Sequence, residues 1–262
     1  MKEIRISTYA ELMEALFAHA WREDLRRFRS PYAFRGQQDA SHRLDTTLAR
    51  MGGPYAEMER HLLRNFRKYA LRSEVENDSV WNWLSIAKHH GLPTRLLDWS
   101  FSPYVALHFA TSDIGRFGID GAIWMVDYIA AHRRLPAALQ AQLQDEGSDL
   151  FTVEMLADTV ATLQELDGLA PAPFMVFFEP PSLDARITNQ YALFSLMSSP
   201  TAQHDDWLIE HSELSRKILF PAKLKWEIRD KLDQANITER VLFPGLDGLS
   251  AWLKRQYSPR ID

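Results

Sequence analysis

The spacing of apolar residues divides the chain into many short segments. Helical spacing predicts helices over residues 9–27, 55–72, 80–90, 104–111, most of 130–167, 222–234 and 244–256. Thr8 with Glu11 resembles a capping box, and Ser102 followed by Pro103 is typical of a helix start. Gly91 stands where a left-handed helix stop belongs. Short helices with defined starts are therefore expected throughout.

Apolar runs of strand length lie between these helices. We expect strands over residues 32–36, 121–128, 174–178, 190–197 and 217–220, with a short turn or helix over 183–189. The strands do not alternate regularly with the helices, which favours an α+β fold over a doubly wound sheet. The 262 residues suit a single domain with an N-terminal helix (about 7–28), a core (about 30–200) and a C-terminal helical part (about 201–262).

Composition removes several classes of function. The chain contains no cysteine, which excludes disulfides, thiolate nucleophiles and cysteine-ligated zinc. A net charge of -5 gives no overall attraction to nucleic acid, so such binding would need a local patch. The arginine-rich run 22–29 is one candidate, but it also holds Glu23 and Asp24 and is better interpreted as a solvated helix face. Without a long apolar run we expect no membrane partner and a cytoplasmic location.

Familiar catalytic motifs are missing. The sequence has no G-x-x-x-x-G-K-[ST] loop, no G-x-G-x-x-G after a strand and no G-x-S-x-G elbow. No histidine pair has the spacing of H-E-x-x-H, and the adjacent His89 and His90 would point about 100° apart on a helix. We therefore expect no metal site.

Phe34-Arg35-Gly36-Gln37 is the first stretch that suggests a binding site. Arginine presents five donors in a planar fork suited to phosphate or carboxylate, and glycine lets a ligand approach the backbone. The alternative is an arginine paired with an internal acid beside a turn, and the residues alone leave both interpretations open.

The second stretch runs from His89 to Ser102. If it is a strand, Arg95 and Asp98 lie on opposite faces, and each needs a distant partner or a ligand because burying an unpaired charge is costly. Ser102 adds a hydroxyl at a helix start, where free N–H groups favour anions. Trp99 would stack against a flat ring or pack in the core.

The third stretch runs from Arg186 to Phe194. Gln190 stands at the mouth of an apolar strand, where it would bind a ribose hydroxyl or a ring amide, or simply belong to a turn. Glu179 is a further acid at a strand end.

These stretches together resemble the FRG domain family. The resemblance rests on Phe34-Arg35-Gly36-Gln37, on residues 89–110 (HHGLPTRLLDWSFSPYVALHFA), on Arg186 with Gln190, and on the ending 242–254. It covers the chain from about residue 30 to 255.

The order of these parts is also similar to an ADP-ribosyltransferase fold, with a split β-sheet surrounded by helices. The resemblance implies NAD as cofactor. The residues that it implies for binding are Phe34, Arg35, Gly36, Gln37, His89, Thr94, Arg95, Trp99, Ser100, Ser102 and Gln190, and those for catalysis are Arg35, Asp98, Ser102 and Gln190. Gln190 stands where one branch of those enzymes carries a glutamate, so the missing carboxylate would come from Asp98 or Glu179, or be dispensable.

The resemblance implies transfer of ADP-ribose from NAD to a macromolecular acceptor, protein or nucleic acid. A bacterial toxin or antiphage effector with an antitoxin partner is one setting for such a reaction. An NAD glycohydrolase and a non-catalytic nucleotide-sensing or interaction module are the alternatives.

Overall fold

Strands β4 (Tyr32–Gln37) and β6 (Gly121–Asp127) lie at the centre of the sheet. β6 is a nearly continuous apolar run buried on both faces, whereas β4 is apolar and buried only over its first three residues. The computed structural model describes residues 2–71, 75 and 77–259, and within them seven strands form a mixed sheet in the order β1-β9-β6-β4-β5-β8-β7. The remaining strands are β1 (Lys2–Arg5), β5 (Leu97–Ser100), β7 (Met175–Phe178), β8 (Ala192–Met197) and β9 (Ser215–Phe220). β1 pairs with β9 in parallel, and the other neighbours pair antiparallel.

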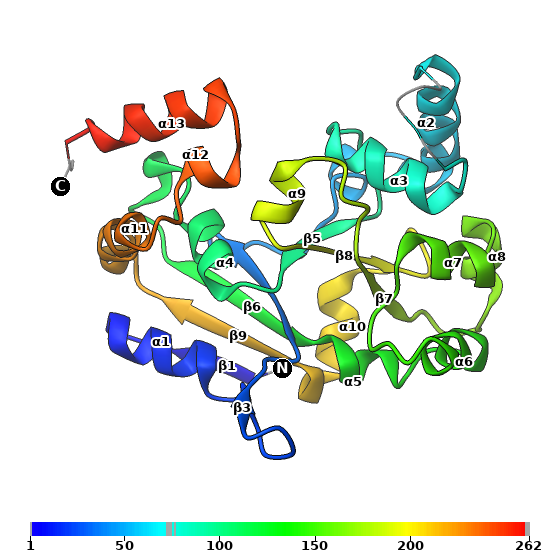
Figure 1. The fold of residues 1–262 in the computed structure, drawn as a ribbon, viewed down its shortest axis with the longest axis horizontal. Coiled ribbons are helices and arrows are strands. Elements are labelled where there is room, and N and C mark those ends of the chain that lie inside the picture. Colours follow the sequence, from blue (N-terminus) through cyan, green and yellow to red (C-terminus); the bar gives the residue numbers. More distant parts are fainter. Residues whose placement is uncertain (1, 72–74, 76, 260–262) are drawn as a thin grey trace.

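Helices cover both faces of this sheet (Figure 1). The α-helices of the fold are α1 (Tyr9–Phe17), α2 (Tyr55–Tyr69), α3 (Val80–His89), α4 (Pro103–Ala110), α5 (Tyr128–His132), α6 (Ala137–Asp145), α7 (Val153–Thr159), α8 (Leu163–Gly168), α9 (Ala185–Asn189), α10 (His204–Glu210), α11 (Lys225–Gln234), α12 (Glu239–Leu242) and α13 (Leu246–Gln256). In the described part of the chain, no helix is long and apolar enough to cross a membrane.

The predicted α+β class is confirmed, as are most element types. The capping box at Thr8, the N-cap Ser102 and the left-handed Gly91 (φ 84°) lie where the sequence predicts them. The strand predicted over 217–220 is confirmed as part of β9, and β1, which was not predicted, pairs with β9 at the edge of the sheet. The helical stretch 130–167 is divided among four short helices. The predicted end of the second helix at Arg72 lies outside the described residues.

The helix predicted over residues 9–27 is wrong beyond Phe17. Residues 21–28 instead form a small antiparallel ribbon of β2 (Trp21–Arg22) and β3 (Arg27–Phe28), with the rings of Trp21 and Phe28 5.1 Å apart. Both rings are largely exposed. The apolar spacing looks helical, but the segment packs against no core. Apolar residues at helical spacing stabilise a helix mainly when its apolar face is buried.

Strand β5 begins later than expected, and Gln190 is not in a strand. Thr94 and Arg95 precede β5, while Gln190 ends α9 and is followed by Tyr191 at a positive φ of 50°. The alternation expected across residues 95–98 therefore does not apply to Arg95.

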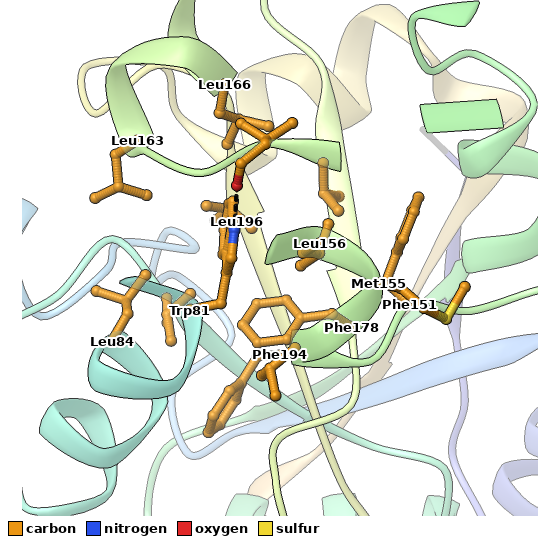
Figure 2. Close-up of a cluster of buried hydrophobic side chains, with 14 of the residues drawn as sticks. Trp81, Leu84, Phe151, Met155, Leu156, Leu163, Leu166, Phe178, Phe194 and Leu196 are labelled. Atoms are coloured by element: carbon orange, nitrogen blue, oxygen red, sulfur yellow. Dashed lines mark hydrogen bonds between the residues drawn. The ribbon is translucent and has the colours of Figure 1, made fainter. Parts of the chain in front are cut away.

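Two apolar clusters share one face of the sheet but are separate. One packs α1, α4 and α11 on strands β4, β6 and β9, and includes Phe34. The other packs α3, α7 and α8 on β7 and β8, and includes Phe194. Figure 2 shows Trp81 in this second cluster, where its Nε1 donates to the carbonyl oxygen of Val160 at 2.7 Å.

The two halves of the sheet meet at a narrow junction between β4 and β5. These strands pair at Phe34 and Ser100 alone among the described residues, whereas β4 pairs with β6 along its whole length. The sheet therefore forks on one side of this pair. The candidate site lies in this fork.

Candidate functional site

A cavity of about 1090 Å³ opens at the fork between β4 and β5. Its wall comes from β4, β5, β8, α3, α4, α9 and the segments after β4 and α4. Figure 1 shows α4 and α9 on the same side of the central strands. The volume exceeds that of most small-ligand pockets and is sufficient for a dinucleotide.

Positive charge dominates the lining. Its fixed cations are Arg35, Arg43, Arg50, Lys88, Arg116 and Arg186, and its carboxylates are Asp45, Asp98 and Asp113. Six cations against three acids in a chain of net charge -5 make this a local anion-attracting region. Arg43, Arg50, Lys88 and Arg116 were not predicted, because nothing in their local sequence distinguishes them from ordinary surface cations.

Arg35 spans the fork. Its Nη1 donates to the carbonyl oxygen of Asp98 at 2.6 Å and lies 3.9 Å from Oδ2 of the same residue. The side chain is 19% exposed, so the guanidinium is accessible from the cavity and is not sealed by a carboxylate. Burial lowers the pKa of Arg35, partly offset by Asp98. An anionic ligand would relieve this desolvation, since Nε of Arg35 is buried without a hydrogen-bond partner among the described residues.

Lys88 holds the carboxylate of Asp98. Its Nζ lies 2.7 Å from Asp98 Oδ2, and the lysine side chain is only 10% exposed while that of Asp98 is 54% exposed. Desolvation opposes ionisation of Asp98, but Lys88 first and Arg35 next outweigh it, and the pKa of Asp98 lies below its ordinary value. Asp98 is therefore a charged acceptor facing the cavity.

Gly36 and Gln37 serve the fold. A Cβ on Gly36 would lie 1.9 Å from the carbonyl oxygen of Ala106, so the glycine is what lets α4 cross β4 closely. Gln37 is buried, accepts from Trp124 Nε1 at 2.8 Å and donates to the carbonyl oxygen of Arg43 at 3.0 Å. Both line the cavity, but their main contacts are internal.

Of the two serines, Ser100 lines the cavity and Ser102 is absent from its lining. Ser100 Oγ donates to the carbonyl oxygen of Gln190 at 2.7 Å and accepts from the amide of Ser102 at 3.0 Å. Ser102 caps α4 by accepting from the amide of Val105 at 3.4 Å. Ser100 therefore ties β5 to the end of α9.

Gln190 and Arg186 bring α9 to the cavity wall. The side-chain amide of Gln190 donates to the carbonyl oxygen of Leu242 at 2.9 Å, which leaves its oxygen and its second N–H available to a ligand. The guanidinium of Arg186 lies 5.0 Å from the ring centroid of Phe243.

The other predicted residues divide between the cavity and the core. His89 lines the cavity, and its Nε2 lies 3.0 Å from Asp184 Oδ2. Phe34 and Trp99 contribute to the wall but are buried, and Trp99 Nε1 donates to Ser195 Oγ at 2.8 Å, as expected for core packing. Glu179 is not among the residues that line this cavity.

Thr94 and Arg95 lie away from the cavity. Arg95 is buried and binds Glu59 and Asp167, with Nη1 to Asp167 Oδ1 at 2.6 Å. The amide of Thr94 donates to Thr47 Oγ1 at 3.1 Å. The sequence analysis expected a distant partner or a ligand for Arg95, and the structure shows two acidic partners, Glu59 and Asp167.

The family comparison matches the part of the chain that builds the fork. Residues 30–117 match the FRG domain model. The chain contains an FRG domain. This domain supplies β4, α2, α3, β5 and α4, and hence Arg35, Lys88, Asp98 and Ser100. The facing wall, with Arg186 and Gln190, lies outside the matched FRG segment.

Comparison with curated proteins and with solved structures gives no match.

Proposed function

We propose that the cavity binds NAD and that the protein transfers ADP-ribose to a macromolecular acceptor. The observation that carries this proposal is the convergence of Arg35, Ser100 and Gln190 on one cation-lined cavity, from β4, from β5 and from the end of α9. These residues come from the three stretches of sequence on which the resemblance to ADP-ribosyltransferases rests. The fork between β4 and β5 supports the proposal, because the resemblance implies a split sheet.

The charges suit a pyrophosphate. Arg35, Arg50 and Arg186 line the cavity, and no carboxylate of the described residues lies closer than 3.9 Å to their guanidinium groups. Guanidinium groups bind phosphate oxygens through short charge-assisted hydrogen bonds. The two negative charges of the pyrophosphate in NAD would offset part of the positive excess.

Asp98 is the carboxylate placed to assist the reaction. In the proposed step the bond between the nicotinamide nitrogen and the ribose carbon breaks, its electron pair leaves with nicotinamide, and an acceptor nucleophile bonds to that carbon and loses a proton. Positive charge grows on the ribose meanwhile, and an ionised carboxylate stabilises it. Gln190 orients the ribose without adding charge.

A non-catalytic nucleotide-binding module is the second candidate. Two contacts favour it: the side-chain amide of Gln190 donates to the carbonyl oxygen of Leu242, and the carboxylate of Asp98 is already paired with Lys88. Such a module would bind the nucleotide and signal through a partner. If NAD is consumed, a toxin or antiphage effector controlled by an antitoxin is the biological role that we propose.

Incubation with labelled NAD, with and without cell lysate, separates these functions. Label recovered on protein or nucleic acid supports transfer, and nicotinamide release without an acceptor supports a glycohydrolase. Binding of NAD without nicotinamide release supports the sensing module, and no binding contradicts the proposal. The Asp98→Asn variant should reduce turnover more than tenfold, whereas Asp145→Asn, at an exposed helix end, should not.

A further inference from the structure

The C-terminal segment 241–243 contacts three side chains in α9 and at its C-cap, beside the cavity. Asn189 Nδ2 donates to the carbonyl oxygen of Val241 at 2.7 Å, and Gln190 Nε2 donates to that of Leu242 at 2.9 Å. The ring of Phe243 faces the guanidinium of Arg186 at 5.0 Å. Figure 1 shows α12 beside α9, although Gln190 and Leu242 are 52 positions apart in sequence.

Phe243 also reaches the opposite wall of the cavity. Its ring centroid lies 6.1 Å from that of Phe109 on α4, at an interplanar angle of 86°. Phe109 and Arg186 both line the cavity. One half-buried aromatic side chain therefore bridges α4, from the FRG segment, and α9, from outside it.

A buried ion-pair network among α11, α12 and α13 fixes the position of segment 241–243. Arg255 on α13 binds Glu239 on α12 and Asp233 on α11 through four hydrogen bonds of 2.6–2.8 Å. Desolvation opposes ionisation of Glu239, but Arg255 and Arg229 lower its pKa to about 2. Gly248 lets α13 approach closely, since a Cβ there would lie 1.9 Å from the carbonyl oxygen of Phe243.

We infer that Phe243 is a positioning residue of the cavity, acting through Arg186. Among the described residues Arg186 has no carboxylate within 4.0 Å, so the ring face is the contact that orients its guanidinium while leaving the charge available to an anion. Asn189 and Gln190 fix the rest of α9 to the same segment. The identity of the anion rests on the proposed function, but the contact between Phe243 and α9 does not.

Affinity for ADP-ribose, measured by calorimetry, tests this inference with a graded series. Phe243→Ala and Phe243→Leu should each weaken binding about three- to fivefold, because both remove the π face that holds the guanidinium. Phe243→Trp should retain wild-type affinity, since an indole provides a stronger face. Tyr257→Ala is the matched control, because Tyr257 is an aromatic residue at the end of the same C-terminal unit and is 83% exposed.

Hydrogen exchange of α9 gives a second measurement that needs no ligand. The amides of Gln190 and Tyr191 donate to the carbonyl oxygens of Arg186 and Thr188. Both should exchange faster in Phe243→Ala and remain protected in Phe243→Trp, with β4 and β6 unchanged. If Phe243→Ala does not fold, Asn189→Ala replaces it. Asn189 is exposed, and the substitution removes one hydrogen bond between α9 and segment 241–243.

The outcomes separate the two proposals. Weaker ADP-ribose binding with faster exchange in α9, both restored by tryptophan, supports the positioning role. Unchanged affinity and unchanged exchange overturn it, as does equal loss of affinity in Phe243→Trp. If the wild-type protein does not bind ADP-ribose, the proposed function fails, and the exchange data alone decide whether Phe243 positions α9.

Discussion

Lys88 and Asp98 form an ion pair with Nζ 2.7 Å from Oδ2, joining the last turn of α3 to the second residue of β5. The lysine is nearly buried and the aspartate is half-exposed toward the cavity. The buried ammonium of Lys88 therefore stabilises the negative charge of the Asp98 carboxylate at the cavity. This arrangement makes the protonation of Asp98 a measurable property of the site.

Replacing Lys88 by methionine should raise the pKa of Asp98. Lys88 is the largest of the charges that lower this pKa, and Arg35 alone would offset less of the desolvation. Because the folded pKa lies below the ordinary value of 3.8, ionised Asp98 stabilises the fold above that pH. This contribution is lost as the pH falls through the folded value.

A carboxyl NMR titration of Asp98 in the wild type and in Lys88→Met measures this shift. Lys68→Met, on the exposed face of α2, is the control and should leave the titration unchanged. An identical Asp98 curve in Lys88→Met would show that the pair does not govern its charge.

Arg35→Ala should weaken ADP-ribose binding tenfold or more while the protein remains folded. Hydrogen bonds to charged groups contribute about 1.5–3 kcal/mol each, which corresponds to this loss. The fold should tolerate the change because burial already disfavours the charged side chain. Calorimetry and thermal unfolding measure the two effects, and Arg35→Lys should recover part of the affinity. A loss of folding equal to the loss of binding would instead identify Arg35 as structural.

Gly36→Ala should destabilise the protein by about 3 kcal/mol, the upper end of the cost of overpacking. The added Cβ would meet the backbone of α4 at Ala106 and Ala110, and backbone atoms cannot rotate away. Gly118→Ala is the matched control: its Cβ would meet nothing within 4 Å, and the expected change is within about 0.5 kcal/mol. Urea unfolding compares the two, and similar stabilities would contradict the close crossing of β4 and α4.

Arg95→Met should lower the free energy of unfolding by about 3–5 kcal/mol, because Glu59 would remain buried without its partner. ADP-ribose affinity should not change, since Arg95 lies outside the cavity. Urea unfolding and calorimetry on the same preparation test both statements. A reduced affinity for ADP-ribose with an unchanged free energy of unfolding would show that Arg95 belongs to the binding site.

Local sequence was sufficient for element types where burial and capping agree. The runs at β6 and β7 are apolar on both faces, and Ser102 marks a helix start by chemistry that acts within one turn. Residues 21–28 show the limit of this reasoning, because their helical spacing is not accompanied by a surface to pack against.

By itself, the sequence determined the α+β class, the FRG motif and the stretches around Arg35, Asp98 and Gln190 that line the cavity. Tertiary structure alone decided that Arg95 pairs with Glu59, that Gly36 serves helix packing, that Ser100 rather than Ser102 lines the cavity, and that Lys88 and Phe243 support it. The physical reason is the difference in sequence separation over which these interactions act. Capping and periodicity act between neighbours in sequence, whereas ion pairs and close contacts depend on which distant segments the folded sheet brings within a few ångströms.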